Sequence, residues 1–287
     1  MTKIPYFPFS RNPFEAAIEA HPLDLEKWIE PDHRLTVDLE EKTHIFKNHQ
    51  NITHGVNSEA HDACIELEEE LRKNLLKFHS GIYRQNGSLF SISGQEKSFS
   101  IPPSLPPLMQ AALYVQEDFA LMSPKAPVKL EAGANCFLSR WKLPEKLGKN
   151  IEEIHLPVPY FDHLNRSTNL FLEKLKVESP VWRSNWIIQD SPNLFCPEIS
   201  RNPISFTKEN VLEKTWLRIE RQTLRRLPAT GYVAFSIRTY LHSMHELALD
   251  PAQKELAYLT IRDLPLSTAV YKGMRNCWEE LKAALQD

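Results

Sequence analysis

The sequence predicts an α+β fold in which helices flank a central antiparallel sheet at both termini. The first observation is a change of hydrophobic period, because apolar residues recur every second position in three runs, 181–188, 216–224 and 232–241, and at helical spacing before and after them. The second is a turn sequence, Leu-Pro-Ala-Thr-Gly at 227–231, which joins two of these runs as an antiparallel hairpin. Helices grouped around a block of strands are typical of α+β proteins.

The N-terminal half is predicted to be mainly helical. Residues 1–35, rich in proline and aromatic side chains, are expected to form an extended arm. Charge spacing predicts a helix over about 35–49, and an N-cap at Asn57–Ser58 predicts a second helix over about 57–79. Residues 80–107 are polar and end in IPPSLPP, so we expect a connection there. Apolar residues three to four apart predict a third helix over about 108–122.

The middle of the chain mixes short elements. Two runs, 128–130 and 135–141, are strand-like, and 144–153 is expected to be a polar loop or a short helix. Residues 155–159 (HLPVP) are expected to be rigid and extended, because two of them precede proline and are biased away from the α region. An amphipathic helix is predicted over about 160–176.

The C-terminal part, about 250–287, is predicted to be helical, with Pro251 at a first helical position and Pro265 interrupting the pattern. We found no repeats. The predicted organisation is an N-terminal arm, 1–35, followed by one domain over 36–287 with helical flanks.

Composition excludes several classes of function. The 287 residues carry a net charge of −3, which gives no electrostatic footprint for nucleic acid. No apolar run approaches the ~20 residues of a membrane helix, and no secretory h-region is visible near the start, so a cytoplasmic protein is expected. The four cysteines are far apart, which argues against a zinc knuckle or an iron–sulfur cluster. With only 8 glycines, the chain has no GxGxxG, P-loop or GxSxG motif.

His155 is the first candidate for chemistry. It lies between a loop and a strong helix, in a segment that two prolines stiffen. An axial haem ligand needs one neutral imidazole held in one orientation. From spacing alone, a buried structural histidine is the simpler interpretation.

The strand runs supply the other candidates. Arg183 and Asn185 fall on one face of 181–188, and a buried arginine must be paired or face a ligand anion. Arg218 and Glu220 fall on one face of 216–224. On an exposed strand they would form a weak ion pair. In a pocket, Glu220 could act as a base or bind an amine.

Several segments together resemble the haem-dependent oxidative N-demethylase alpha-subunit-like family, long described as a domain of unknown function. The resemblance covers roughly residues 20–280. It rests on QED at 116–118, LEAGANCFLSRW at 130–141, KLG at 146–148, IHLPVP at 154–159, VWRSNW at 181–186, RIERQTLRRLP at 218–228 and FSIRTY at 235–240. The segment before Trp141 departs from the family's FPSxW pattern, and the N-terminal arm is less similar, so the resemblance does not fix the substrate.

The resemblance implies a PAS-like α+β core that binds haem b through a histidine. It implies an oxidative demethylation of dimethylamine by O2, which gives methylamine and formaldehyde. Electrons would come from NADPH through a separate flavin and 2Fe–2S reductase subunit, and a tetrahydrofolate-using partner could capture the formaldehyde. Carried onto this sequence, His155 is the expected iron ligand, while Arg183, Asn185 and Arg218 are expected to contact the cofactor. Glu220 and Arg183 are the expected catalytic residues.

Two functions therefore stay open, together with a weaker third. The first is a haem monooxygenase subunit acting on a small methylated amine. The second is a haem-binding PAS-like sensor or binding protein without turnover, since one fold hosts many functions. The third is a haem-free structural homologue. No output module is recognisable in the flanking helices, which favours the enzyme, and a neighbouring gene for a reductase would favour it further.

Overall fold

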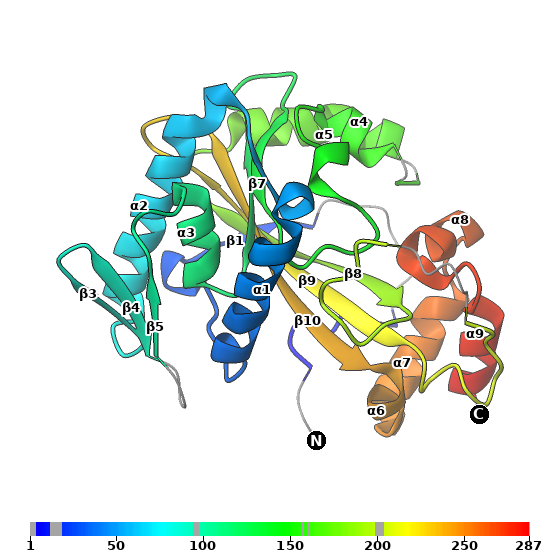
Figure 1. Ribbon diagram of the computed structural model, residues 1–287. Coiled ribbons are helices and arrows are strands. Elements are labelled where there is room, and N and C mark those ends of the chain that lie inside the picture. The colour runs from blue at the N-terminus through cyan, green and yellow to red at the C-terminus, as the bar shows by residue number, and fades with distance from the viewer. Residues whose placement is uncertain are drawn as a thin grey trace.

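A seven-stranded antiparallel sheet forms the centre of this computed structural model (Figure 1). The structure describes residues 4–11, 19–93, 98–156, 158–159, 161–198 and 204–286, except for the side chains of 161–166. The strand order is β1-β8-β9-β10-β6-β7-β2. The strands are β1 (His21–Pro22), β2 (His54–Val56), β6 (Asp118–Met122), β7 (Leu130–Ala134), β8 (Val181–Gln189), β9 (Trp216–Arg226) and β10 (Val233–Ser243). Together with the flanking helices, this sheet confirms the α+β prediction, and the PAS-like assignment stays a prediction.

The three long strands have the period and the turn that the sequence predicted. β9 and β10 form a hairpin around 227–231, with Arg226 opposite Val233. β8 pairs with β9 along its whole length, with Asn185 opposite Glu220. Because residues directly opposite each other share a face, the sheet has an Arg221 face, which carries the odd-numbered residues 217–225 of β9, and a Glu220 face, which carries the even-numbered residues 216–226.

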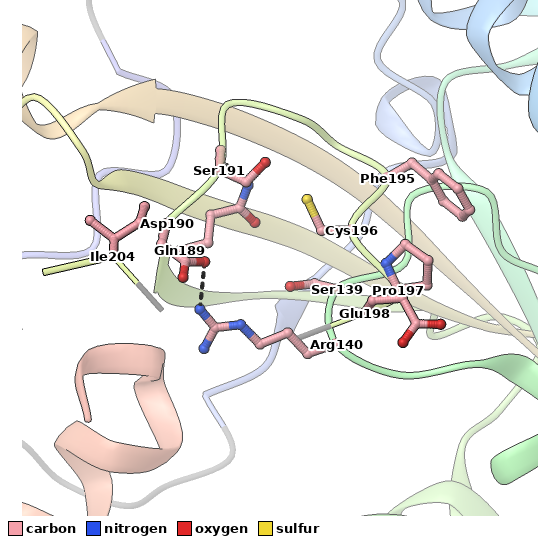
Figure 2. Close-up of a pocket in the computed structure, with 10 residues that line it drawn as sticks. All are labelled: Ser139, Arg140, Gln189, Asp190, Ser191, Phe195, Cys196, Pro197, Glu198 and Ile204. Carbon is pink, nitrogen blue, oxygen red and sulfur yellow. Dashed lines mark hydrogen bonds and ion pairs between the residues drawn. The ribbon is translucent and has the colours of Figure 1, made fainter. Parts of the chain in front are cut away.

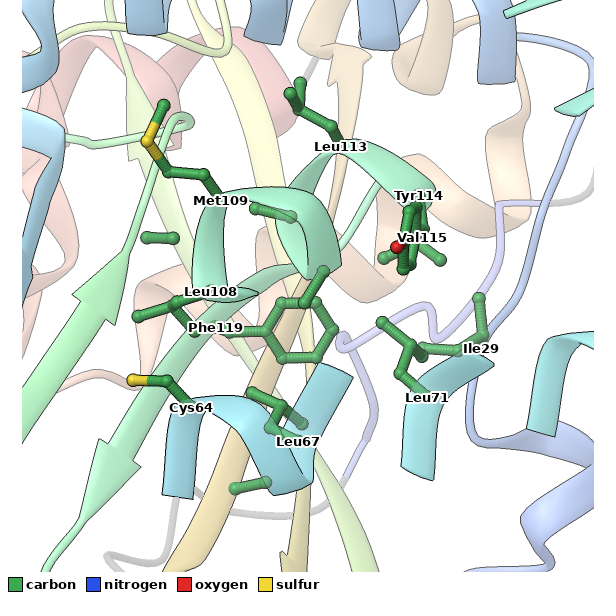
Figure 3. Close-up of a cluster of buried hydrophobic side chains, with 14 of the residues drawn as sticks. Ile29, Cys64, Leu67, Leu71, Leu108, Met109, Leu113, Tyr114, Val115 and Phe119 are labelled. Carbon is green, nitrogen blue, oxygen red and sulfur yellow. The ribbon is translucent and has the colours of Figure 1, made fainter. Parts of the chain in front are cut away.

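Helices cover the Arg221 face in two groups, one from each end of the chain (Figure 1). Near β6 and β7, α2 and α3 pack around the buried ring of Phe119 (Figure 3). Near β8 and β9, the C-terminal helices bury Leu217 and Ile219. The helices of the first group are α1 (Leu35–Thr53), α2 (His61–Phe78) and α3 (Pro107–Tyr114), and those of the second are α6 (Met244–Ala248), α7 (Pro251–Arg262) and α9 (Trp278–Gln286).

Shorter elements lie over the Glu220 face and along the edge of β8. The 3-10 turn η3 (Leu143–Glu145), α4 (Ile151–His155) and α5 (Phe161–Lys174) contribute to a third apolar cluster with Leu224 and Val233. The short helix α8 (Leu266–Ala269) leads into a π-helical turn, η4 (Val270–Met274), which packs against β8. Two further 3-10 turns are η1 (Leu25–Lys27) and η2 (Ser58–Ala60).

Most predicted helices are confirmed, with ends displaced by a few residues. The helix predicted over 35–49 is α1, and the one predicted over 160–176 is α5. The C-terminal part is helical, with Pro251 in the first turn of α7 and Pro265 before α8. No helix in the described part of the chain is long and apolar enough to cross a membrane.

Three predictions of secondary structure in the N-terminal half were wrong. The helix expected over 108–122 ends at Tyr114, and Asp118–Met122 is strand β6, buried on both faces. The connection expected over 80–107 contains a small antiparallel sheet of β3 (Tyr83–Asn86), β4 (Leu89–Ser93) and β5 (Ser98–Ile101). The strand expected over 135–141 lies earlier, as β7.

The expected arm, 1–35, contributes buried side chains in its described part. Phe9 is buried among the C-terminal helices, and Trp28 and Ile29 among the N-terminal ones. The division into an arm and one domain over 36–287 stays a prediction.

Candidate functional site

Strands β8 and β9 bring three of the predicted site residues onto one face of the sheet. Asn185 lies directly opposite Glu220, and Arg183 lies opposite Gln222, the next residue along that face. Alternation along each strand is the cause, because side chains two positions apart point the same way. The Glu220 face therefore carries a group of neighbouring polar side chains in the middle of the sheet.

Glu220 is held in one orientation. Its Oε1 accepts a hydrogen bond from Arg218 Nε at 3.2 Å, and its Oε2 accepts one from Gln222 Nε2 at 3.1 Å. The side chain is 22% exposed, so the carboxylate stays accessible from the Glu220 face. Carboxylates held by two donors keep a fixed geometry, which a binding or catalytic group requires.

Arg218 contacts protein groups on several sides and is 1% exposed. Besides Glu220, its guanidinium donates to the carbonyls of Leu194 at 3.0 Å and of Phe137, and to Thr239 Oγ1 at 3.3 Å. These bonds tie the loops at 137 and 194 to the sheet. Through these contacts Arg218 positions Glu220 and the two loops.

Arg183 is in a different situation from Arg218. Among the described residues it has no hydrogen bond and no ion pair within 4 Å, and its Nε is buried. Burial lowers the pKa of the Arg183 guanidinium, while the charges of Tyr271, Glu19 and Glu220 raise it. The Arg183 side chain is partly buried, and withdrawing a guanidinium from water without a partner is costly, so Arg183 is suited to bind an anion.

The turn η4 adds two residues that sequence reasoning did not find, Tyr271 and Lys272. Lys272 Nζ donates to Asn185 Oδ1 and to the Trp186 carbonyl, each at 2.9 Å. Burial raises the pKa of the Tyr271 phenol, and the nearby Glu220 charge raises it further. In the sequence, Gly273 was the sign of this turn, because a lone glycine in a helical pattern marks a break. Its φ of 87° and its lack of a Cβ allow η4 to approach the Ile188 carbonyl of β8 closely.

His155 reaches the same cluster from α4. The helix begins at Asn150, whose side chain caps it, and His155 is its last residue. The extended conformation expected for 155–159 is therefore wrong at its start, where Leu156 is also in the right-handed α region. Within α4, His155 Nδ1 lies 2.8 Å from the Ile151 carbonyl oxygen, one helical turn earlier.

The hydrogen bond from His155 to Ile151 fixes the tautomer of the ring. A carbonyl only accepts, so Nδ1 carries the proton and Nε2 carries the lone pair in the neutral ring. Burial lowers the pKa of His155, and the charges of Lys146 and Arg183 lower it further, although the bond to Ile151 raises it. The neutral ring is thus favoured at neutral pH, and the influence of Arg183 places the two residues in one electrostatic environment.

Lys146 connects His155 with Glu220. Its Nζ lies 4.0 Å from the centre of the Trp141 ring, a distance at which the ring stabilises a cation. Burial lowers the pKa of the Lys146 ammonium, and the Glu220 charge raises it. The resulting Glu220 cluster contains a neutral imidazole, a fixed carboxylate and several cations, and its members are Lys146, His155, Arg183, Asn185, Glu220, Tyr271 and Lys272.

A surface pocket of about 410 Å³ lies elsewhere, at the end of β8 (Figure 2). Its walls include the ion pair of Arg140 with Asp190, 2.9 Å apart, and the side chain of Cys196. None of the predicted site residues lines it. Among the described residues, no group of three or more His, Cys, Asp or Glu side chains could hold a bare metal ion.

One comparison with known proteins bears on this cluster. The family model described as "haem-dependent oxidative N-demethylase, alpha subunit-like" matches residues 19–282. The match spans every member of the Glu220 cluster, from Lys146 to Lys272. This chain belongs to the haem-dependent oxidative N-demethylase alpha-subunit-like family.

Proposed function

We propose that this protein is a haem-dependent oxidative N-demethylase, which uses O2 to remove a methyl group from a small methylated amine such as dimethylamine. The observation that carries the proposal is that Arg183 and Glu220, which lie far apart in the sequence, share one face of the sheet, and that the charge of Arg183 acts on the pKa of His155 in α4. Family membership supports the same activity. The balanced reaction consumes O2, two electrons and two protons, and it yields the demethylated amine, formaldehyde and water.

The residues of the Glu220 cluster fit a haem group. His155 has a neutral imidazole whose Nε2 carries the lone pair, and this is the form of the ring that would hold the haem iron. Arg183 can pair with a propionate carboxylate, and its buried Nε has no hydrogen-bond partner among the described residues. Apolar side chains around the cluster, Trp141, Ile154, Val158 and Phe235, can contact a porphyrin ring. Haem bound here supplies the iron chemistry by which O2 oxidises an N-methyl group.

The chain's own residues then orient the reactants. Ile151 holds the His155 ring through its Nδ1–H. The Glu220 carboxylate, which Arg218 and Gln222 fix in place, accepts the N–H of an amine. The cations around Glu220 disfavour an alkylammonium ion and favour the free amine, which is the oxidisable form. Asn185 is held by Lys272 and completes the polar floor of the site.

The electron supply and the fate of the product belong to the same proposal. The reaction needs two electrons from outside the chain, and the sequence has no nucleotide or cluster motif of its own. We therefore assign NADPH oxidation to a separate flavin and 2Fe–2S reductase subunit, and formaldehyde capture to a tetrahydrofolate-using partner. We expect the protein in the cytoplasm, where NADPH is available.

A hemin titration of the purified protein tests the proposal. We expect a sharp Soret band that saturates at one haem per chain and shifts on reduction and with CO. His155→Ala should abolish this spectrum, whereas His245→Ala, a change at an exposed histidine, should leave it intact. An unchanged spectrum in His155→Ala would reject the ligand assignment.

Formaldehyde release separates the enzyme from the alternative. The haem-loaded protein, supplied with dimethylamine, O2 and a reductase or chemical electron donor, should release one formaldehyde per methyl group removed. Haem binding without formaldehyde from any methylated amine would favour the sensor or binding protein.

A further inference from the structure

Lys272 is a buried lysine whose ammonium group forms no ion pair with a carboxylate of the described chain. Its residue is 7% exposed, and Nζ donates to two neutral acceptors, Asn185 Oδ1 and the Trp186 carbonyl. A lysine ammonium has three N–H bonds. Two are directed to these acceptors, and no described residue takes the third. The third N–H of Nζ therefore has no hydrogen-bond acceptor among the described residues.

The charged and titratable groups around Lys272 come from each element packed against it. Burial lowers the pKa of Lys272 to about 8, the charge of Arg183 lowers it as well, and the charge of Glu220 raises it. The Trp186 ring, 4.8 Å from Nζ, favours the charged form. The groups that surround η4 and the cluster are Lys146, His155 and Tyr271 in addition to Arg183 and Glu220, with Arg140 next to Gly273.

The proposed reaction needs a group that accepts a proton. An alkylamine resembles the lysine side chain, whose pKa is about 10.4, so it arrives as an ammonium ion at neutral pH. Both oxygens of Glu220 already accept hydrogen bonds from protein groups, and Arg183 is a cation. Carboxylates are also poor bases toward ammonium ions, because an ordinary Glu pKa is about 4.3. An amine with a pKa near 8 is a better acceptor by between three and four powers of ten, on the order of the difference between these values.

Resting on the proposed function, we propose that Lys272, in its neutral form, takes the proton of the incoming alkylammonium ion and so delivers the substrate as a free amine. One N–H bond of the substrate breaks and one N–H bond forms on Nζ. No electrons move, and Lys272 later returns the proton to solvent. The bonds to Asn185 and Trp186 persist in both states, because neutral lysine retains two N–H donors.

Nuclear magnetic resonance of protein labelled with ¹³C at the lysine Cε tests the first half of the proposal without any turnover. We expect the Lys272 signal to titrate near pH 8, below the ordinary lysine value of about 10.4. Lys272→Arg should remove that signal, whereas Lys73→Arg, a change at an exposed lysine, should retain it. A Lys272 signal that titrates with the ordinary lysines would overturn the proposal.

The pH dependence of the rate of dimethylamine binding to the haem-loaded protein, followed by the Soret band in a stopped-flow instrument, tests the second half. If Lys272 takes the proton of the ammonium ion, the association rate constant should rise with the neutral fraction of Lys272 and level off above about pH 8. In Lys272→Arg, whose side chain keeps its proton, only the free amine of the solution binds. Its rate constant should be lower at pH 8 and should keep rising toward the ordinary amine pKa of about 10.4.

The outcomes separate this inference from the proposed function. A wild-type rate profile that matches that of Lys272→Arg overturns the role of Lys272 alone. No binding of any methylated amine at any pH overturns the substrate class, and this inference with it.

Discussion

Gly273→Ala offers a quantitative test of how η4 is held against the sheet. Gly273 has a φ of 87°, and a Cβ at this position would overlap the Ile188 carbonyl oxygen and lie 3.2 Å from the Ile188 carbonyl carbon. A left-handed backbone costs an alanine about 1–2 kcal/mol. Overlap with a packed backbone costs a further ~1–3 kcal/mol. A gain of about 0.4–1 kcal/mol from the stiffer unfolded chain offsets part of this.

Gly87→Ala is the matched control for the backbone effect. Gly87 also has a positive φ, 60°, but a Cβ there would meet nothing within 4 Å. We therefore expect Gly87→Ala to lose about 1 kcal/mol of unfolding free energy and Gly273→Ala about 2–4 kcal/mol. Urea unfolding followed by tryptophan fluorescence measures both. Equal losses in the two variants would refute the close approach of η4 to β8, and with it the placement of Lys272.

Two further predictions concern titration and thiol chemistry. Burial lowers the pKa of His79 and His242 below the ordinary value of about 6.5, so the unfolded chain binds protons first as the pH falls. The contribution of the two neutral histidines to stability is complete above pH 6.5 and is lost below it. A urea midpoint that does not decrease between pH 7.5 and pH 5.5 would contradict this. Cys196 is the most exposed of the four free cysteines, and the others are buried. A disulfide reagent at pH 8 should therefore modify one thiol rapidly in the folded chain and all four in urea. Rapid modification of further thiols in the folded chain would show that their burial is wrong.

The long strands could be predicted from the sequence because one face of each differs from the other. In β9 the alternation of Leu217, Ile219 and Arg221 with Arg218 and Glu220 assigns each residue to a face before any contact is known. β6 could not be predicted in this way. All five of its residues, Asp118–Met122, are buried, so no alternation appears, and a short apolar run of this kind is compatible with a helix.

The Glu220 cluster could be predicted only in part, for a physical reason. Arg183, Asn185 and Glu220 stand on strands whose pattern gives their direction. Lys272 meets Asn185 across 87 positions of sequence, through a turn whose geometry depends on one glycine. No local pattern encodes such a contact, and the roles of His155, Arg183, Asn185, Arg218 and Glu220 stay predictions.

Arginines on the two faces of the sheet differ in how they are paired. Those on the Arg221 face each meet a carboxylate from the N-terminal segment or from α2. The pairs are Arg221 with Glu30 at 3.3 Å, Arg225 with Glu70 at 2.6 Å and Arg238 with Asp32 at 2.7 Å. On the Glu220 face, Arg218 meets Glu220, but Arg183 meets no carboxylate within 4 Å among the described residues. Each of the four buried arginines of the described chain is paired with a carboxylate, whereas the partly buried Arg183 is not, so it is suited to a ligand anion.

Arg183→Met should therefore act differently on stability and on binding. Removing an unpaired guanidinium relieves its desolvation cost, so the haem-free variant should be as stable as the wild type or more stable. Hemin affinity should fall about tenfold or more, because a charge-assisted hydrogen bond contributes about 1.5–3 kcal/mol. Arg238→Met is the control, since it removes the ion-pair partner of Asp32 and one of the two that Asp38 has, and it should cost about 3–5 kcal/mol of unfolding free energy. If Arg183→Met destabilises the chain as much as this control does, then Arg183 has a structural role, and the anion site does not exist.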